Sequence, residues 1–349
     1  MEPDVIIEDW SPVGNIQAFV EKTDKNYYLY LWINPESDKP EIRSCWICNR
    51  KKAPKSIEDA FAVEGEAPCM PAEFVAHDSN GIDLDESALH LQWFEEGDSV
   101  ALLSGSNLLA VIPCFSGYDG FSGYSVYAKG TGPFAWELKQ AYSHFEEQVK
   151  RSRDFWDFFE TDYWGEVQDT HMNALESFFG PHDKYYAIDR NEFPPKAMAT
   201  GRKGNVLYTI TLGVSMIPMP KVEMNYNDDY RKYRRMELGF ACDTSQEKHM
   251  HSVMSAIAYL ASMPWAEQTF LGHGHTIPFD EIDGYSHLLF LNSRELNIPN
   301  APQYKDFLGD PINLLWLKPI TKSEYDYIVE NGSAAYLKDK DASDIIIFR

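Results

Sequence analysis

The sequence of this 349-residue chain predicts an α+β fold organised as two domains. Over the first 115 residues, short runs of aromatic, aliphatic and β-branched residues alternate with turn residues. After Pro133 the apolar period changes to that of a helix, and the second half mixes strand and helix patterns. The length suits two domains better than one. We place a β-rich accessory domain that ends in a long helix at residues 1–165, and a mixed sheet with packed helices at residues 166–349.

The first domain is predicted to contain short strands separated by Asn, Pro, Gly and Asp turns. These strands cover residues 27–33, 42–48, 88–94, 100–105 and 108–115. The last two are expected to form a hairpin with a tight turn near Ser106-Asn107. An apolar stripe at 3.6-residue spacing from Leu138 to Phe159 predicts a long amphipathic helix after Pro133.

The second domain begins with a helix over residues 164–179, which Gly180-Pro181 is expected to stop. Strands are predicted at residues 204–215, 233–243, 286–292, 312–320 and 344–348. Two Thr-x-x-Glu capping boxes, at Thr244 and Thr321, predict the starts of two further helices. The Pro-broken segment 216–232 is expected to be an excursion or an exposed loop.

The net charge is −23, from 31 basic and 54 acidic residues. A field of that sign repels nucleic acid and anionic membranes and attracts cationic protein partners. No stretch approaches the ~20 apolar residues of a membrane span, and the N-terminal residues lack a signal-peptide pattern. We therefore expect a cytoplasmic protein with no nucleic-acid or membrane partner.

Five cysteines form an odd, sparse set, as expected of reduced thiols rather than of a disulfide framework. Cys45 and Cys48 have metal-knuckle or redox spacing, but they fall on a predicted strand. Residues three apart on a strand face opposite sides, so we expect neither a metal nor a redox role for this pair.

The sequence LGHGHTIPFD at residues 271–280 raises the question of a metal site. In an extended segment, His273 and His275 face the same way and could share an ion in a metal-dependent hydrolase. The third ligand would then be one of the following: Asp280, Glu281, Asp283 or His287. The interpretation that we favour is a structural loop, because glycines supply special backbone angles and histidines can satisfy loop backbone. We assign that role to Gly272, His273, Gly274, His275 and Thr276, expect no metal or other cofactor, and expect His275 to be substantially buried and hydrogen-bonded.

In their order and spacing, six pieces of the second half resemble the suppressor-of-fused domain family. They are residues 208–215, 234–243, 249–265, 271–279, 286–296 and 311–328. The resemblance implies a mixed sheet with packed helices, and it implies protein binding rather than catalysis. Bacterial members of the family look like immunity proteins, or antitoxins, against delivered toxins. The first 165 residues resemble no family that we can name.

We therefore expect a non-enzymatic immunity protein that neutralises a basic bacterial toxin by stoichiometric binding. The alternatives are the hydrolase described above and a scaffold protein of a larger complex. Within the acidic, ring-bearing segment 223–230, the candidate partner-binding residues are Tyr226, Asp228, Asp229 and Tyr230.

Overall fold

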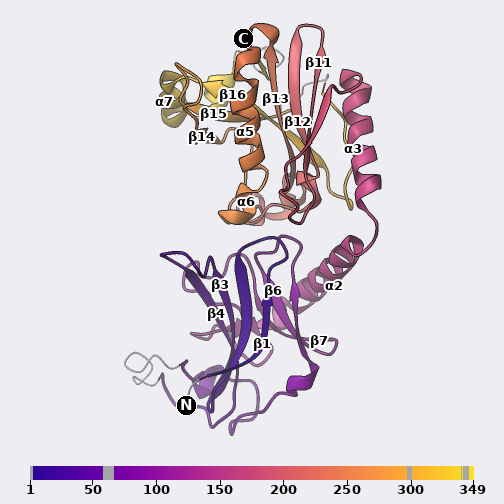
Figure 1. Ribbon diagram of the computed structural model, residues 1–349. Helices are drawn as coiled ribbons and strands as arrows, with labels where there is room; N and C mark the ends of the chain where they lie inside the picture. Colours follow the sequence, from indigo (N-terminus) through magenta and orange to yellow (C-terminus); the bar gives the residue numbers. More distant parts are fainter. Residues whose placement is uncertain (1–2, 58–66, 297–300, 339, 341–345) are drawn as a thin grey trace. The chain divides into compact units, whose positions relative to one another are not determined.

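The computed structural model describes residues 3–57, 67–296, 301–338, 340 and 346–349 (Figure 1). The chain separates into two compact units, Met1–Glu160 and Thr161–Arg349. Each unit has its own buried apolar core. The N-terminal unit is built mainly from strands, and the C-terminal unit combines a mixed sheet with helices, so the predicted α+β class is confirmed.

The N-terminal unit contains two sheets. The first is a four-stranded antiparallel meander of β1 (Asp4–Trp10), β2 (Ile16–Lys22), β3 (Asn26–Ile33) and β4 (Glu41–Asn49). The second has the order β5 (Leu89–Trp93), β6 (Val100–Ser104), β7 (Asn107–Ile112), β8 (Tyr124–Ser125) and β9 (Trp136–Glu137). Alternate side chains of both sheets form one shared core, which includes Val20, Leu29, Leu102 and Ala110. The predicted strands of this domain are thus confirmed to within a few residues.

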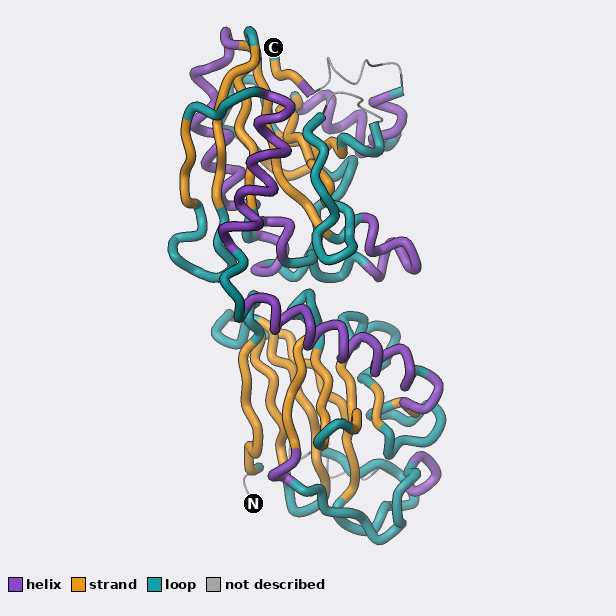
Figure 2. The backbone as a smooth tube through the Cα atoms, turned by 90° about the vertical axis from the view of Figure 1, so that its right-hand side faces the viewer, coloured by secondary structure: helices purple, strands orange, loops and turns teal. Residues whose placement is uncertain are grey.

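The long helix of the N-terminal unit is α2 (Tyr142–Phe159), and it packs on the second sheet. Its buried residues Phe145 and Val149 share a cluster with Phe94 and Leu103. The helix begins at Tyr142 rather than directly after Pro133, because β9 and a 3-10 turn at Leu138–Gln140 occupy the intervening residues. The layers of this unit are therefore helix, second sheet and first sheet (Figure 2).

Two local predictions for this unit were wrong in detail. The hairpin turn lies at Gly105-Ser106, since Ser104 pairs with Asn107 and Gly105 has a φ of 56°. Cys45 and Cys48 do not face opposite sides. A bulge in β4 places them opposite Leu29 and Tyr27, which both face the core. Both thiols are fully buried and free, and burial raises their pKa values, as expected of inert core cysteines.

The C-terminal unit is built on an eight-stranded mixed sheet. Its strands, in spatial order, are β10 (Lys184–Ala187), β11 (Ala197–Lys203), β12 (Val206–Leu212), β13 (Arg235–Asp243), β16 (Ile312–Ile320), β15 (His287–Asn292) and β14 (Thr276–Pro278), with β17 (Ile347–Phe348) also paired to β13. The β13–β16 and β13–β17 pairs are parallel, and the other pairs are antiparallel. Part of the predicted strand 344–348 lies outside the described residues.

Helices cover both faces of this sheet (Figure 1). On one face, α3 (Trp164–Phe179), α7 (Lys322–Asn331) and α8 (Ser333–Leu337) share a core with Ala199 and Ile210. On the other lie α5 (Met250–Leu260) and α6 (Met263–Ala266). As predicted, α3 ends at Gly180, whose φ of 90° suits glycine. None of the described helices is long and apolar enough to cross a membrane.

The connection from β12 to β13 differs from the predicted exposed loop. Residues 214–220 are buried, and Met216, Ile217 and Met219 pack inside the unit. Only the following turns reach the surface, as the short helix α4 (Glu223–Tyr226) and the 3-10 helix η5 (Asn227–Lys232). The Pro residues here interrupt regular structure without exposing the chain, because the side chains between them are apolar.

The two predicted capping boxes have different outcomes. The box at Thr321 and Glu324 is confirmed, with both reciprocal hydrogen bonds present at the start of α7. The box at Thr244 is wrong, because Asp243 provides the cap by accepting from the Ser245 N–H, and the turn that follows is the 3-10 helix η6 (Thr244–His249).

Replacing Thr321 by alanine is therefore expected to lower the free energy of unfolding by about 1 kcal/mol, since it removes a helix cap. Thr244→Ala is the matched control, because it makes the same chemical change beside a cap that Asp243 supplies. Denaturant unfolding of the two variants measures the difference. Equal losses would contradict the assignment of the caps.

Candidate partner-binding site

The candidate contact segment, residues 223–230, lies on α4 and the start of η5. Asp228 and Asp229 are exposed in the first turn of η5, where the free backbone N–H groups of a helix start favour acidic side chains. Asp229 pairs with Lys232 at 2.6 Å, a surface ion pair of little energetic weight. The two carboxylates are thus presented to solvent on a short, folded element rather than on an open loop.

The two tyrosines of this segment are half-buried against their own unit. The Tyr226 ring stacks on Tyr233 with centroids 4.2 Å apart, and burial raises the pKa of the Tyr226 hydroxyl. The guanidinium of Arg234 lies 5.4 Å from the centre of the Tyr230 ring. These contacts hold the rings in place, so the segment offers the partly exposed faces of two fixed rings beside two exposed carboxylates, one of which pairs with Lys232.

A buried charge cluster supports the segment from below. The Asp310 carboxylate accepts from Nε of Arg231 at 2.6 Å, of Arg234 at 2.7 Å and of Arg235 at 3.1 Å. Burial alone would raise the pKa of Asp310, but the three guanidinium groups outweigh it and hold that pKa below its usual range. Because Arg231 belongs to η5 and Arg235 starts β13, Asp310 ties the candidate segment to the central sheet.

A second buried network joins β12, β13 and α3. The Glu237 carboxylate accepts from the Thr211 hydroxyl at 2.6 Å, the Ser215 hydroxyl at 2.6 Å and the Gly213 N–H at 3.0 Å. His171 Nδ1 lies 2.9 Å from the Val167 carbonyl, and its Nε2 lies 3.1 Å from Ser215 Oγ and 3.4 Å from Glu237.

The protonation of this network follows from its acceptors. Since the Ser215 hydroxyl donates to Glu237, His171 Nε2 must donate to Ser215, while Nδ1 donates to Val167. Burial would lower the pKa of His171, but Glu237 outweighs it and raises that pKa. The pair is therefore an imidazolium and a carboxylate. All three side chains are buried, and the serine proton points at the acid rather than at the imidazole, so the arrangement serves the fold.

The histidine loop is tied to neighbouring backbone. His273 Nδ1 accepts from the Asn292 N–H at 3.1 Å, and the His275 side chain hydrogen-bonds the Phe270 carbonyl. Both imidazoles are half-buried, and burial lowers both pKa values. Thr276 begins β14.

The residues considered as a third metal ligand are placed differently. Asp280, Glu281 and Asp283 are exposed, and the His287 ring stacks on Tyr325 with centroids 3.6 Å apart. Among the described residues, no group of three His, Cys, Asp or Glu side chains is arranged to hold a metal ion.

The two glycines of this loop differ, contrary to the expectation that both supply special φ values. Gly274 has a φ of 82°, and a Cβ there would lie 2.3 Å from Ser333 Oγ, whereas Gly272 has no positive φ and meets only ordinary contacts. We expect Gly274→Ala to lower the free energy of unfolding by about 1–2 kcal/mol, from the left-handed backbone alone. Gly272→Ala, the control, should change it by less than half as much in the same denaturant experiment. The reverse order would contradict this account of the loop.

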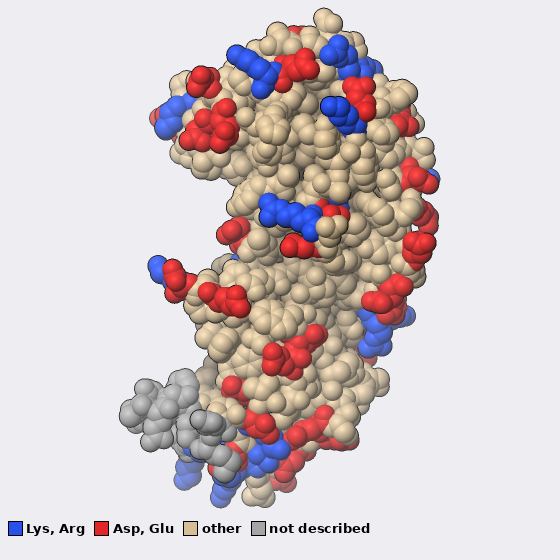
Figure 3. Space-filling model, in the orientation of Figure 1, with Lys and Arg blue, Asp and Glu red and all other residues tan. Residues whose placement is uncertain are grey.

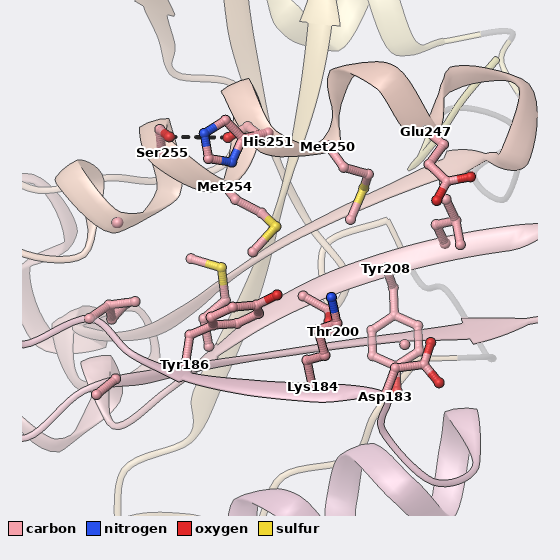
Figure 4. A pocket seen from close by; sticks show the side chains of 16 residues that line it. Asp183, Lys184, Tyr186, Thr200, Tyr208, Glu247, Met250, His251, Met254 and Ser255 are labelled. Atoms are coloured by element: carbon pink, nitrogen blue, oxygen red, sulfur yellow. Dashed lines mark hydrogen bonds between the residues drawn. The ribbon is translucent and has the colours of Figure 1, made fainter.

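A hollow that the sequence did not reveal lies between α5 and the strands β10 and β11 (Figure 4). Its volume is about 560 Å³, and Met198, Met250 and Met254 line it from both sides. Asp183 and Glu247 stand at one end of it (Figure 4). The hollow was missed because neither β10 nor β11 was predicted, and these two strands form the wall that faces the methionines of α5. Methionine-lined surfaces adapt to varied apolar side chains, so the hollow is a second candidate contact.

Acidic side chains are spread over both units on the face shown in Figure 3, with lysines and arginines between them. The charge therefore favours encounter with cationic partners without identifying one interface.

Comparisons with known proteins bear on the C-terminal unit. Residues 191–348 match the family model described as Suppressor of fused protein (SUFU). These residues thus form a SUFU-like domain, which confirms the resemblance for this part of the chain. A solved chain titled "the Sufu-Fu complex crystal structure" is similar with 10% identity and a TM-score of 0.37, over 52% of this chain and 88% of that chain. No curated protein matches the chain.

Proposed function

We propose that this protein is a non-enzymatic immunity protein that binds a basic bacterial toxin stoichiometrically and blocks it. The observation that carries the proposal is the SUFU-like domain at residues 191–348, since the family resemblance implies protein binding. The net charge of −23 supports a cationic partner. Toxins that cleave nucleic acid are basic because they bind phosphates, and an acidic inhibitor is steered onto them rapidly.

The proposed contact is the segment 223–230. Asp228 and Asp229 would pair with Lys or Arg side chains of the toxin, and the faces of Tyr226 and Tyr230 would pack beside them. The segment is held by the Asp310 cluster before any partner arrives, so little ordering would be needed on binding. The methionine-lined hollow offers space for an apolar side chain of the same partner.

The hydrogen bonds that occupy the histidine, serine and glutamate side chains of the C-terminal unit also support binding rather than catalysis. His273 Nδ1 is occupied by a backbone N–H, and His171, Ser215 and Glu237 satisfy one another inside the unit. Side chains committed in this way hold the backbone in place, as a rigid binding surface requires.

The test is co-purification of the tagged full chain from its native cells, with mass spectrometry of what it retains. A basic toxin-like protein is expected, and calorimetry with that purified protein should give one-to-one binding and loss of toxin activity. Retention of no protein above the level of an unrelated acidic bait would overturn the proposal.

We expect Asp228→Asn with Asp229→Asn to weaken binding of that partner about fivefold to tenfold at low salt, since two exposed charges at an interface rim are removed. Most of the loss should appear in the association rate, because rim charges steer encounter. The matched control is Glu281→Gln with Glu330→Gln, which removes two exposed carboxylates elsewhere in the unit. Equal losses in the two double variants would move the interface away from residues 223–230.

A further inference from the structure

The outer face of the β1–β4 sheet departs from the usual pattern of a solvated antiparallel sheet. Such a sheet normally places apolar residues toward the core and polar residues toward water. The inner face here obeys the rule, with Ala18, Val20, Leu29 and Leu31 in the core. The second sheet has α2 on its far side, whereas none of the described α-helices packs on the outer face of the β1–β4 sheet.

The strand register defines this outer face as three rows. One row is Trp10, Gln17, Trp32 and Ile42; the next is Glu8, Phe19, Tyr30 and Ser44; the third is Val5, Glu21, Tyr28 and Trp46. Residues directly opposite one another in a ladder share a face. Four of the six outward positions on β2 and β3 are therefore aromatic, where polar residues would be expected.

Part of this outer face is covered and part is open. Tyr28 is buried and donates to the Pro68 carbonyl, and the buried Trp46 stacks on His77, so one end of the face lies beneath the chain around residues 68–77. At the open end Trp10 is 45% exposed and Ile42 is 55% exposed.

The partly exposed rings of Tyr30 and Trp32 are linked through the buried ring of Phe19. Phe19 stacks on Tyr30 at 5.1 Å and meets Trp32 edge-on at 5.3 Å, so the rings fix one another. A partly exposed surface of rigid aromatics, with Trp10 and Ile42 open beside it, is characteristic of a recognition site.

The charges on this outer face are all of one sign. Glu8 and Glu21 lie in the rows, and none of the described residues in the three rows is a lysine or arginine. Gln17 Nε2 donates to Glu8 at 2.7 Å, and the Tyr30 hydroxyl hydrogen-bonds Glu21. The Gln17 amide and the Tyr30 hydroxyl therefore serve the carboxylates of the face, and the Tyr28 hydroxyl is taken by the Pro68 carbonyl. A polyhydroxylated ligand would find few free partners, whereas a cation would find two carboxylates beside aromatic rings.

We propose that this outer face is a docking surface for an arginine-rich segment of a partner protein, whose guanidinium groups lie over Trp10, Tyr30 and Trp32 and pair with Glu8 and Glu21. Guanidinium is the cation that both stacks on rings and forms two-pronged bonds to carboxylates. The inference rests on the proposed function in requiring a basic protein partner. It assigns to the N-terminal unit a contact that does not involve residues 223–230.

The test uses fluorescently labelled hexa-arginine and hexa-lysine peptides, with binding to the full chain followed by anisotropy at about 0.15 M salt, where long-range attraction is screened. Hexa-arginine is expected to bind several-fold more tightly than hexa-lysine. Trp10→Ser should weaken hexa-arginine binding about threefold to thirtyfold and remove its advantage over hexa-lysine, because the stacking contribution is lost. Glu8→Gln, which keeps the shape of the side chain, should weaken the binding of both peptides. This variant provides the test if Trp10→Ser does not fold.

The matched controls are Tyr118→Ser, an exposed ring in a loop of the same unit, and Glu146→Gln, an exposed acid on α2. Both should stay within about twofold of the wild type, because surface substitutions away from a contact change little. If the controls lost as much affinity for hexa-arginine, or if the wild type bound the two peptides equally, the binding would be explained by diffuse charge attraction. Either result would overturn the inference. A wild-type dimer that Trp10→Ser converts to monomer would also overturn it, since a second copy would then occupy the face.

These outcomes are separate from those of the toxin test. The face can fail to select arginine while a toxin still binds through Asp228 and Asp229. It can also select arginine while no toxin is found, in which case the proposed function fails and the docking surface stands.

Discussion

Replacing Glu237 by glutamine is expected to lower the free energy of unfolding of the C-terminal unit by about 3–5 kcal/mol, the cost of removing one member of a buried ion pair. The side chain is fully buried and receives hydrogen bonds from Thr211, Ser215 and the Gly213 N–H. An amide would place a donor against these donors and would leave the His171 imidazolium without its counter-charge. Denaturant unfolding of the full chain, followed by tryptophan fluorescence, measures the change.

The pH dependence of stability gives an independent reading of the same pair. The pKa of Glu237 is lowered from 4.5, so its contribution is present above that value and is lost as the pH falls through the folded pKa. The pKa of His171 is raised from 6.5, so its contribution is complete below that value and is lost as the pH rises through the folded pKa. The pair should therefore stabilise the unit most between about pH 4.5 and 6.5.

Glu281→Gln, which removes an exposed carboxylate, should leave both the stability and its pH profile almost unchanged. If Glu237→Gln unfolds like this control, or if its pH profile matches that of the wild type, then Glu237 and His171 are not an ion pair. His171→Gln separates the two members, since it should abolish the loss of stability above pH 6.5 that is expected of the wild type.

Much of the fold could be predicted from local sequence patterns, because each depends on neighbouring residues. The run at 312–320 is mostly apolar, with Asn313 and Lys318 as the exceptions, since β16 is buried between two strands. The predicted bounds match the observed strand. Thr321 and Glu324 form a cap from residues three apart, so their spacing alone is informative. The Thr244 box failed because an equally good cap, Asp243, precedes it by one residue.

The positions and partners of the buried charged residues could not be predicted from local sequence patterns. Within 233–243 the sequence suggested only a strand, yet Arg235 and Glu237 are fully buried on it. Their neutralising partners are distant in sequence: Asp310 lies 75 residues after Arg235, and His171 lies on α3. The signal that was present is that charged residues on a central strand require buried partners. Naming those partners requires the three-dimensional arrangement.

The candidate contact surfaces also depend partly on local sequence and partly on the three-dimensional arrangement. The acids and rings of 223–230 could be chosen from composition, but their support by Tyr233, Arg234 and Asp310 could not. The aromatic rows of β1–β4 depend on strand register, which relates Trp10 to Trp32 and Ile42 across four strands. A one-residue shift in any pair would have turned those rings into the core.

Asp310→Asn is expected to lower the free energy of unfolding by about 3–5 kcal/mol, and to weaken partner binding further than loss of the surface charges does. Removing the carboxylate charge leaves Arg231, Arg234 and Arg235 facing one another in a largely buried space. Since Arg231 belongs to η5, the variant should also loosen the segment that carries Asp228 and Asp229. Denaturant unfolding measures the first effect, and hydrogen exchange of residues 223–232 measures the second.

Arg231→Gln separates the two effects, because Arg231 is the member of the cluster that is partly exposed. It should cost much less stability than Asp310→Asn, while still raising hydrogen exchange in η5 and lowering partner affinity. The pKa of Asp310 is lowered from 3.8, so its contribution is complete above that pH and is lost only as the pH falls through the folded pKa. Unchanged exchange in η5 in both variants would show that Asp310 supports the sheet alone, and that the exposed acids are positioned by α4 and the stacked tyrosines.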